Sequence, residues 1–435
     1  MKIFQPKIIS SLKGYNGHKL LSDVIAGVIV AIIALPLSIA LAIASGAEPA
    51  QGLFTAAVAG LVIAALGGSR VNISGPTAAF ATIVAGVIAS SGMNGLVIAT
   101  LMAGVILIIL GLCRAGSLIR FMPHTITVGF TSGIAVTILI GQIKDFLGLD
   151  FHGATPVEAG EKLIEIVKNF ATLQWKALVV GLIGLAILIA WTILASKIKG
   201  KASMLFKMVP GSIIAVIVGI LVVQFTPLKC ATIGSLYPTL TGGFPKFSLP
   251  EFKLDTVIAV IPDAFAIAIL AAIESLLSCV VSDKMINDKH NSNTELIALG
   301  AGNICSGLFG GIPATGAIAR TAANVKNGGR TPIAGILHAI IILLFLVVMM
   351  PVAKLIPMPI IAAILFLVAY NMSEWKSFLG ICKTRKVGDI IVLVTTFLLT
   401  IILNLVVAII AGILITLIFF LIHKIKEKKA AKNQT

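Results

Sequence analysis

Long runs of apolar residues dominate the chain, and short polar stretches separate them. A helix that crosses a bilayer needs about 20 mostly apolar residues, and on this basis the sequence predicts about fourteen spans. Their ranges are 22–45, 50–67, 76–90, 95–112, 124–142, 177–196, 209–225, 258–281, 294–309, 315–325, 333–351, 358–370, 388–403 and 404–423. The pattern therefore predicts an all-α polytopic membrane protein, with residues 1–21 before the first span and residues 424–435 after the last.

The composition supports this prediction, because 58% of the residues are hydrophobic and only 11% are charged. The core of a soluble protein could not bury so much apolar surface. We therefore expect an integral protein of the cell membrane that is surrounded by the lipid bilayer. The first apolar run is too long for the core of a cleaved signal sequence, so we interpret it as the first span.

The net charge of +16 indicates membrane topology rather than nucleic-acid binding, because the basic residues gather before the first span and in alternate loops. With fourteen spans, these segments all lie on one side, which the positive-inside rule makes cytoplasmic. Both termini are then cytoplasmic, and no nucleic acid is expected as a partner. The basic residues are Lys2, Lys7, Lys13, Lys19, Arg114, Arg120, Lys197, Lys199, Lys201, Lys207, Lys284, Lys289, Lys326, Arg330, Lys376, Lys383, Arg385, Lys386 and those of 424–432.

Glu274 is an ionisable residue near the middle of the apolar run 264–281. A charged group at the centre of a bilayer costs roughly 2.5–3.5 kcal/mol on insertion scales, so it normally faces a cavity, a partner or a transported ion. Two interpretations follow: Glu274 acts in transport, or it is a neutral or paired carboxylate that holds spans together, with Arg320 as its candidate partner.

Two segments rich in glycine and proline, 67–78 and 310–317, occupy corresponding places in the two halves of the chain. Irregular backbone at membrane depth survives only where protein or a watery cavity satisfies it. Each segment leads into a short helix, which we expect to begin at Thr77 in the first half and near Gly316 in the second. Paired broken segments of this kind indicate a transport site at the interface of inverted repeats.

The start of a helix carries free backbone N–H groups and about half a positive charge, so two such ends near each other would attract an anion. Thr77 and Thr315 could add hydroxyl donors, and Arg320 would add a full positive charge, although a structural role for that arginine is nearly as well supported. The sequence has no nucleophile with a base, no metal-ligand cluster and no phosphate-binding loop. We therefore expect neither an enzyme nor a bound cofactor.

Several motifs together resemble the SulP family of anion transporters, the sulfate permease and bicarbonate transporter group. They are Asp23-Val-Ile-Ala-Gly27 with Leu35-Pro36, Ser74-Gly-Pro-Thr-Ala78, Ala272-Ile-Glu274-Ser-Leu-Leu-Ser278, Gly311-Ile-Pro-Ala-Thr-Gly-Ala-Ile-Ala-Arg320-Thr321 and Gly329-Arg-Thr-Pro-Ile-Ala-Gly335. The resemblance covers essentially the whole chain. It implies a fold of uracil-permease type in which residues 22–225 and 226–423 form two inverted repeats of seven spans each.

The resemblance also implies two domains with different roles and a dimeric assembly. A core domain, 22–113 plus 256–351, would carry the site, and a gate domain, 124–225 plus 355–423, would move against it. A homodimer is expected. Family members usually end in a cytoplasmic STAS domain, whereas this sequence stops shortly after the last span, so either it is a naturally short member or the domain was removed.

Carried over residue by residue, the family's sites fall on two sets of positions. The anion would bind at Thr77, Ala78, Gly316, Ala317, Ile318 and Arg320, and the coupling ion would bind at Glu274 and Ser278. Glu274 and Ser278 are one helical turn apart and so share a face. No firm metal site is implied, but sodium at that pair is one alternative.

The chain departs from the family at three positions near these sites. Leu37 stands where many members have a glutamine after the proline of the first span. The sodium-coupled bicarbonate carriers have an aspartate where Glu274 stands and a threonine where Ile318 stands. The missing hydroxyl weakens the prediction of sodium, and a longer carboxylate in an apolar setting suits a proton.

The predicted function is secondary active transport of a small inorganic anion by alternating access, with sulfate or bicarbonate as the first candidates and a proton or sodium ion as the coupling ion. The alternatives are an anion exchanger or an uncoupled anion channel on the same scaffold, or transport of a dicarboxylate. A trap built from helix ends responds to charge and size more than to shape, so the sequence leaves these substrates open.

Overall fold

A computed structural model describes residues 4–117, 123–153, 155–198, 209–240, 242–384, 386–403 and 405–432. Six of the basic residues used for the topology prediction, Lys2, Arg120, Lys199, Lys201, Lys207 and Arg385, lie outside these ranges. Up to residue 225 the α-helices are α1 (Lys7–Ser11), α2 (Gly17–Ala44), α3 (Pro49–Leu66), α4 (Ala81–Leu112), α5 (His124–Leu147), α6 (Ala159–Lys168), α7 (Trp175–Lys197) and α9 (Gly211–Phe225).

The rest of the described chain is also mainly helical. Its α-helices are α10 (Ile233–Leu236), α11 (Leu254–Ala259), α12 (Ile261–Ile286), α13 (Ser292–Leu308), α14 (Ile318–Lys326), α15 (Pro332–Val348), α16 (Met350–Ala353), α17 (Met358–Met372), α18 (Trp375–Lys383), α19 (Val387–Ile402) and α20 (Leu405–Lys432). Two 3-10 helices, η1 (Ala78–Phe80) and η3 (Phe170–Thr172), and two short strands, β1 (Ser74–Gly75) and β2 (Thr315–Gly316), complete the described elements.

Each predicted span coincides with helical structure, although the boundaries differ. The third and fourth predicted spans are joined in α4, which changes direction at Gly92, where φ is 67° and ψ is −174°. Glycine adopts such a left-handed φ without the steric penalty of a side chain. Among the described residues, seven helices are long and apolar enough to cross a membrane, and four further apolar helices are shorter.

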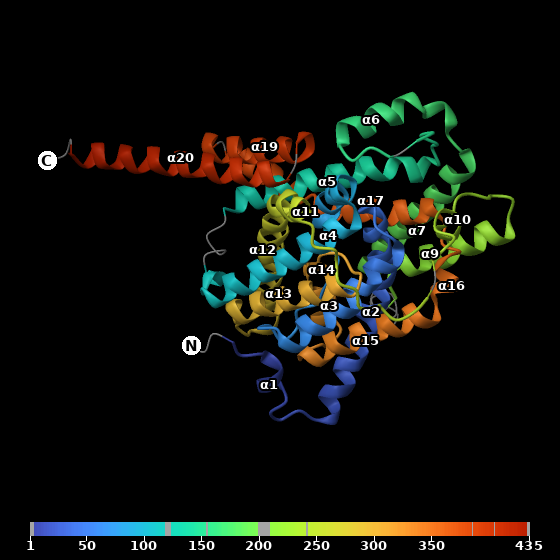
Figure 1. The fold of residues 1–435 in the computed structure, drawn as a ribbon, viewed down its shortest axis with the longest axis horizontal. Helices are drawn as coiled ribbons and strands as arrows, with labels where there is room; N and C mark the ends of the chain where they lie inside the picture. The colour runs from blue at the N-terminus through green and yellow to red at the C-terminus, as the bar shows by residue number, and fades with distance from the viewer. Residues whose placement is uncertain are drawn as a thin grey trace.

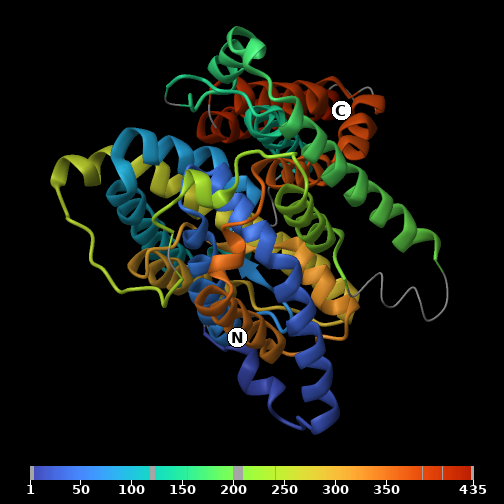
Figure 2. The same ribbon diagram turned by 90° about the vertical axis from the view of Figure 1, so that its right-hand side faces the viewer.

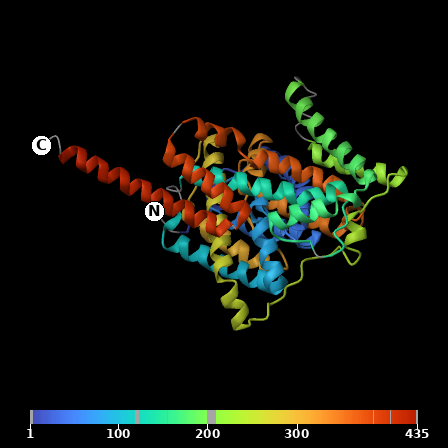
Figure 3. The ribbon, with the colours of Figure 1, turned by 90° about the horizontal axis from the view of Figure 1, so that it is seen from above.

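The helices pack in two groups, and each group draws members from both halves of the chain. Helices α2, α3 and α4 pack against α12, α13 and α15, as Figure 1 shows for the blue and the yellow-to-orange helices. Helices α5, α7 and α9 pack with α17 and α19, and Figure 2 shows α7 along one flank of the molecule. The C-terminal part of α20 extends beyond the other helices in Figure 3. Packing across the halves is what brings the two broken segments together.

Helices α4 and α13 approach each other backbone to backbone where Gly104 faces Gly300. A methyl group added at Gly104 would lie 2.7 Å from the carbonyl oxygen of Gly300, so no larger residue fits there without displacement. Close packing through small residues is the usual mode for helices in membranes, because dispersion contacts provide much of the attraction. This contact fixes α13 beside the first half of the chain.

The two broken segments pair with each other as the short antiparallel strands β1 and β2. Ser74 lies opposite Gly316 and Gly75 opposite Thr315, and the amide of Ala317 donates to the carbonyl of Ile73 at 2.8 Å. Asn303 of α13 holds the second segment by donating to and accepting from the backbone of Ala314, at 2.9 Å each. Protein groups thus satisfy the extended backbone that the sequence predicted at membrane depth.

The helices after these strands begin slightly later than the sequence suggested. Thr77 precedes η1, and α4 begins at Ala81. In the second half, Thr315 and Gly316 form β2, so the short helix α14 begins at Ile318 and the predicted span 315–325 is wrong at its start. The physical reason is the pairing of β1 with β2, which holds the backbone of Thr315 and Gly316 in an extended conformation.

Candidate functional site

A cavity of about 380 Å³ lies where the starts of η1 and α14 meet α12. Its wall is largely apolar, and the polar atoms gather at the two helix starts and at α12. The lining residues are Leu37, Leu41, Pro76, Thr77, Ala78, Thr131, Glu274, Gly316, Ala317, Ile318, Ala319, Arg320, Val368, Asn371, Met372 and Glu374. All six residues predicted to bind the anion line this cavity together with Glu274, whereas Ser278 does not.

Glu274 is half-buried in α12, and the structure joins it to the start of the first short helix. The hydroxyl of Thr77 donates a hydrogen bond of 2.9 Å to Oε2 of Glu274. The predicted hydroxyl donor therefore contacts the predicted coupling residue. Because hydrogen bonds to charged groups are about twice as strong as neutral ones, this bond holds the carboxylate at the cavity wall.

Arg320 is only 2% exposed, although it carries a charge at membrane depth. Its Nη2 donates to the carbonyl of Pro76, which joins α14 to the segment just before η1. Its Nε and Nη1 have no hydrogen-bond partner among the described residues. Buried donors without a partner are costly, so this guanidinium is suited to receive an anion that enters the cavity.

The interpretation of Glu274 and Arg320 as a structural ion pair finds no support in the geometry. Within the part of the chain that the structure describes, no oxygen of Glu274 lies within 4.0 Å of a guanidinium nitrogen of Arg320. The two side chains instead bind groups of the first broken segment, Thr77 and Pro76. Both charges consequently border the cavity without direct contact.

Two predicted oxygen groups are turned away from the cavity. Thr315 was expected to offer a hydroxyl donor, but that hydroxyl donates to the carbonyl of Ala271 at 2.8 Å, so this expectation is wrong. The hydroxyl of Ser278 donates to Oδ1 of Asn72 at 2.7 Å and contacts Thr321 at 3.1 Å. Ser278 thus lies one turn from Glu274, but its hydroxyl serves a different set of partners.

Those partners form a buried polar network that packs against Gly316 of the cavity wall. Its members are Asn72, Ser275, Ser278, Glu295 and Thr321. Glu295 is 1% exposed and accepts the backbone N–H groups of Gly68 and Ser69 at 2.8 and 3.1 Å. It also accepts from Asn72 Nδ2 at 2.7 Å. This network ties the first broken segment to α12, α13 and α14.

Glu295 was not among the predicted site residues, although the sequence carries a signal for it. The residue lies inside the predicted span 294–309, so the argument applied to Glu274 applies to it as well. In the structure its carboxylate is satisfied by four donors, three from the first broken segment and one, the hydroxyl of Ser275 at 3.3 Å, from α12. Its role is therefore to fix the backbone that carries the site.

A helical membrane protein in which broken segments from opposite halves meet at one cavity belongs to the inverted-repeat class of transporters. Comparison with known protein families supports this assignment to a class of transporters. The description of the sulfate permease family matches residues 20–396, and the chain belongs to this family. Among the described residues no group of three or more His, Cys, Asp or Glu side chains could hold a metal ion.

Relatives of known name are transporters. The chain is 41% identical over 430 residues to the putative sulfate transporter YvdB of Bacillus subtilis, covering 97% of this chain and 77% of that protein. It is 31% identical over 392 residues to the bicarbonate transporter BicA of Picosynechococcus, covering 88% of this chain and 67% of that protein. Membership of this family of anion transporters means that the protein is not an enzyme.

Solved structures confirm the fold. The transmembrane domain of a cyanobacterial bicarbonate transporter BicA matches with a TM-score of 0.77 and 27% identity, over 91% of this chain and 98% of that domain. The structure of SLC26A9 matches with a TM-score of 0.87 and 19% identity, over 96% of this chain and 68% of that protein. The all-α membrane fold with two inverted repeats, expected from the sequence, is therefore confirmed.

Proposed function

We propose that this protein is a secondary active transporter that moves a small inorganic anion, sulfate or bicarbonate, by alternating access. The observation that carries the proposal is the cavity of about 380 Å³, where the starts of two short helices and the half-unpaired guanidinium of Arg320 lie in a largely apolar wall. In such surroundings electrostatic attraction is much stronger than in water.

In this proposal the anion binds between the two helix starts. Backbone N–H groups at Ala78 and Ile318 face it, Ala317 lines the cavity between them, and the free N–H groups of Arg320 supply the charge. Thr77 and Gly316 line the cavity just before the two helix starts, where the anion approaches each of them. A side chain at Gly316 would collide with Asn72, because an added methyl group would lie 2.6 Å from Nδ2. Glycine at this position therefore lets the backbone of β2 pack against the buried polar network that holds the first broken segment.

Glu274 couples the anion to a cation, because its negative charge in the same cavity repels an anion until a cation neutralises it. We favour the proton over sodium. The hydroxyl of Ser278 is bonded to Asn72 and Thr321, and Ile318 offers no oxygen, so the oxygens that a sodium ion would need beside Glu274 are few. A proton needs only the carboxylate itself.

Access alternates, in this proposal, by movement of the gate domain, 124–225 plus 355–423, against the core domain, 22–113 plus 256–351. The cavity is lined from both, since Glu274 and Arg320 belong to the core, and Thr131, Val368 and Glu374 to the gate. Glu374 stands just before the basic residues of 376–386, so this cavity faces the predicted cytoplasmic side, where we place both termini. We also propose a homodimer in the membrane, which native mass spectrometry would test.

The test is uptake into proteoliposomes with imposed pH or sodium gradients, screened with sulfate, bicarbonate, chloride and a dicarboxylate. We expect accumulation above equilibrium driven by a pH gradient in the wild type. Glu274→Gln should abolish the accumulation while binding of the anion persists, and Glu251→Gln, at an exposed residue, serves as the control. Dissipation without accumulation in the wild type would identify a channel instead.

The electrostatic role of Arg320 has a separate test. Arg320→Ala should weaken anion binding about tenfold or more, since charge-assisted hydrogen bonds contribute about 1.5–3 kcal/mol each. Arg320→Lys keeps the charge and should recover part of the loss. An unchanged affinity in the alanine variant would show that the anion binds elsewhere.

A further inference from the structure

A second group of cavities lies on the other side of η1 from the site. Three adjoining compartments of about 290, 20 and 350 Å³ share the lining residues Val157 and Lys162. Helix α5 passes both the site cavity and these compartments. Thr131, near its start, lines the site cavity, and Gln142, near its end, lines the second and third compartments. They are therefore on the face that carries α6, opposite to the face where the site cavity opens.

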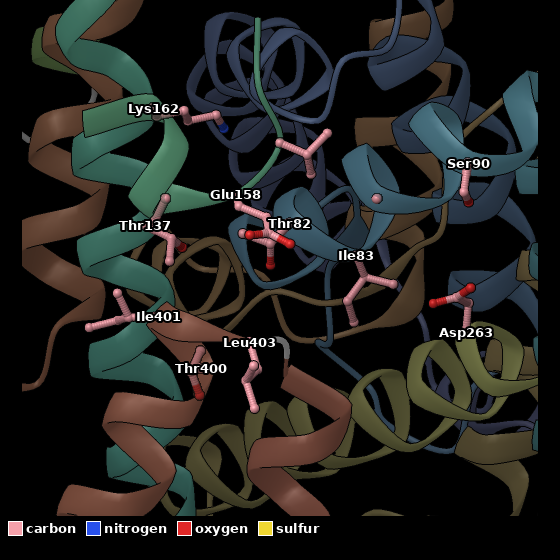
Figure 4. A pocket seen from close by; sticks show the side chains of 13 residues that line it. Thr82, Ile83, Ser90, Thr137, Glu158, Lys162, Asp263, Thr400, Ile401 and Leu403 are labelled. Carbon is pink, nitrogen blue, oxygen red and sulfur yellow. The ribbon is translucent and has the colours of Figure 1, made fainter. Parts of the chain in front are cut away.

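The first compartment has a mixed polar and apolar lining and is built by both halves of the chain (Figure 4). Thr82 and Ser90 come from α4, Thr137 from α5, Asp263 from α12 and Thr400 from α19. Hydroxyl groups can donate to an anion or accept from a cation, so these residues alone do not decide the ligand. The charged residues of its lining are Glu158, Asp263 and Lys162, and Lys162 is the cation among them.

Lys162 supplies that charge from α6, which follows α5 and lies outside the predicted spans. Its side chain is half-buried, and Figure 4 shows its ammonium group extending toward the compartment. In the described part of the chain it has no hydrogen-bond or ion-pair partner. The neighbouring Lys168 is different, since its ammonium binds Glu165 at 3.0 Å.

The surrounding carboxylates do not neutralise Lys162. Glu158 and Asp263 line the first compartment and Asp145 lines the third, yet none lies within 4.0 Å of its ammonium in the described structure. Lys144 is engaged with the hydroxyl of Thr155 at 2.8 Å. Burial lowers the pKa of Lys162, and no carboxylate offsets this effect. A half-buried ammonium group without a counter-charge nearby would be stabilised by an anion that binds beside it.

We infer that Lys162 is the cationic centre of a second anion-binding site, called the outer site, on the α6 side of the molecule. A small inorganic anion would bind there before it reaches the cavity at Glu274 and Arg320. The hydroxyl of Thr82 would add a second donor, whereas the hydroxyl of Thr137 already donates to the carbonyl of Ile134 at 2.8 Å. This inference rests on the proposed function, since it places a second position on the same path.

The two positions are separated by a thin barrier. Ala78 borders the inner cavity, and Ala81 and Thr82 border the outer compartments, so only Ala79 and Phe80 of this segment lie between them. Phe80 is 1% exposed and η1 packs against α5 there. A small movement of α5 relative to η1 would consequently connect the two positions, which fits access that alternates.

The experiment compares Lys162→Gln with Lys168→Gln, a control at an exposed, ion-paired lysine of the same helix. The apparent KM for the anion is measured from each side in proteoliposomes of known orientation. We expect Lys162→Gln to raise the KM on the α6 side about tenfold, the size expected for loss of one charge-assisted contact, and to leave the KM on the opposite side unchanged. Lys162→Arg should restore it.

A covalent test covers the case of a variant that folds poorly. Lys162→Cys is treated with a cationic or an anionic methanethiosulfonate reagent, and wild type is treated in parallel because the chain has five cysteines of its own. The cationic adduct should lower the KM on the α6 side and the anionic adduct should raise it. Equal effects of both reagents, or equal effects of Lys162→Gln on both sides, would overturn the outer site. Transport that survives Arg320→Ala unchanged would instead contradict the proposed function.

Discussion

Asn72 donates a hydrogen bond of 2.7 Å from Nδ2 to Oε1 of Glu295, a residue 223 positions later in the chain. Oε2 of the same carboxylate accepts the backbone N–H groups of Gly68 and Ser69. One buried side chain of the second half therefore fixes the first part of the broken segment 67–78 at three of its residues. The position of Thr77, a few residues further on, depends on this attachment.

Replacing this carboxylate by an amide should destabilise the protein. Glu295→Gln keeps the shape but turns one acceptor into a donor that faces other donors, and a buried unsatisfied group costs about 1–3 kcal/mol. Thermal unfolding in detergent measures the loss. Glu251→Gln, at a carboxylate that is 79% exposed, should leave the midpoint in place, and an equal shift in both variants would argue against the network.

Removing the hydroxyl of Thr77 should alter coupling more than folding. Thr77→Val deletes the donor to Glu274, and hydrogen bonds to charged groups contribute about 1.5–3 kcal/mol. We expect the dependence of transport on the coupling ion to change about tenfold. Thr77→Ser retains the hydroxyl and should behave as wild type. Coupling that is identical in the valine and serine variants would show that this bond has no part in it.

Gly316→Ala should damage the site through sterics. The added methyl group would lie 2.6 Å from Nδ2 of Asn72 and 2.9 Å from Oγ of Ser275, so the network must shift. We expect lower thermal stability and weaker anion binding. Gly380→Ala is the matched control, because nothing lies within 4 Å of its added methyl group and alanine favours a helix over glycine by about 1 kcal/mol.

Asp288 should make stability depend on acid pH at the predicted cytoplasmic face. Burial acts to raise its pKa, but hydrogen bonds from the backbone of Lys289 and from Lys7, with the charge of Arg70, outweigh this and lower the pKa below 3.8. Because the folded pKa is depressed, the stabilisation is present above the unfolded pKa and is lost as the pH falls through the folded value. Asp288→Asn should flatten stability against pH in that acid range, as unfolding at a series of pH values would reveal.

The sequence was sufficient to predict the helical segments, the two broken segments and seven of the residues that line the cavity, but not those from α5 and the segment 368–374. Glycine and proline act locally on the backbone, so 67–78 and 310–317 could be recognised without knowledge of their neighbours. Glu274 could be recognised because a charge in an apolar run is costly wherever the run packs.

The directions of individual hydroxyl groups could not be predicted. Whether Ser278 turns to Glu274 or to Asn72 depends on which helices surround α12, and that depends on packing between residues far apart in the sequence. The strand pairing that moved the start of α14 from Thr315 to Ile318 arises from the same cause. Helix periodicity predicts the face on which a side chain lies, but not the partner that it finds there.

The pairing of β1 with β2 also limits how this protein can change in length. Each strand has two residues, and the side-chain period of a strand is two, so inserting or deleting a single residue between Ile73 and Thr77 would break the match of Ser74 with Gly316. Such a change would rotate one helix start relative to the other. These short segments must keep their length for both halves to present their helix ends to the same cavity.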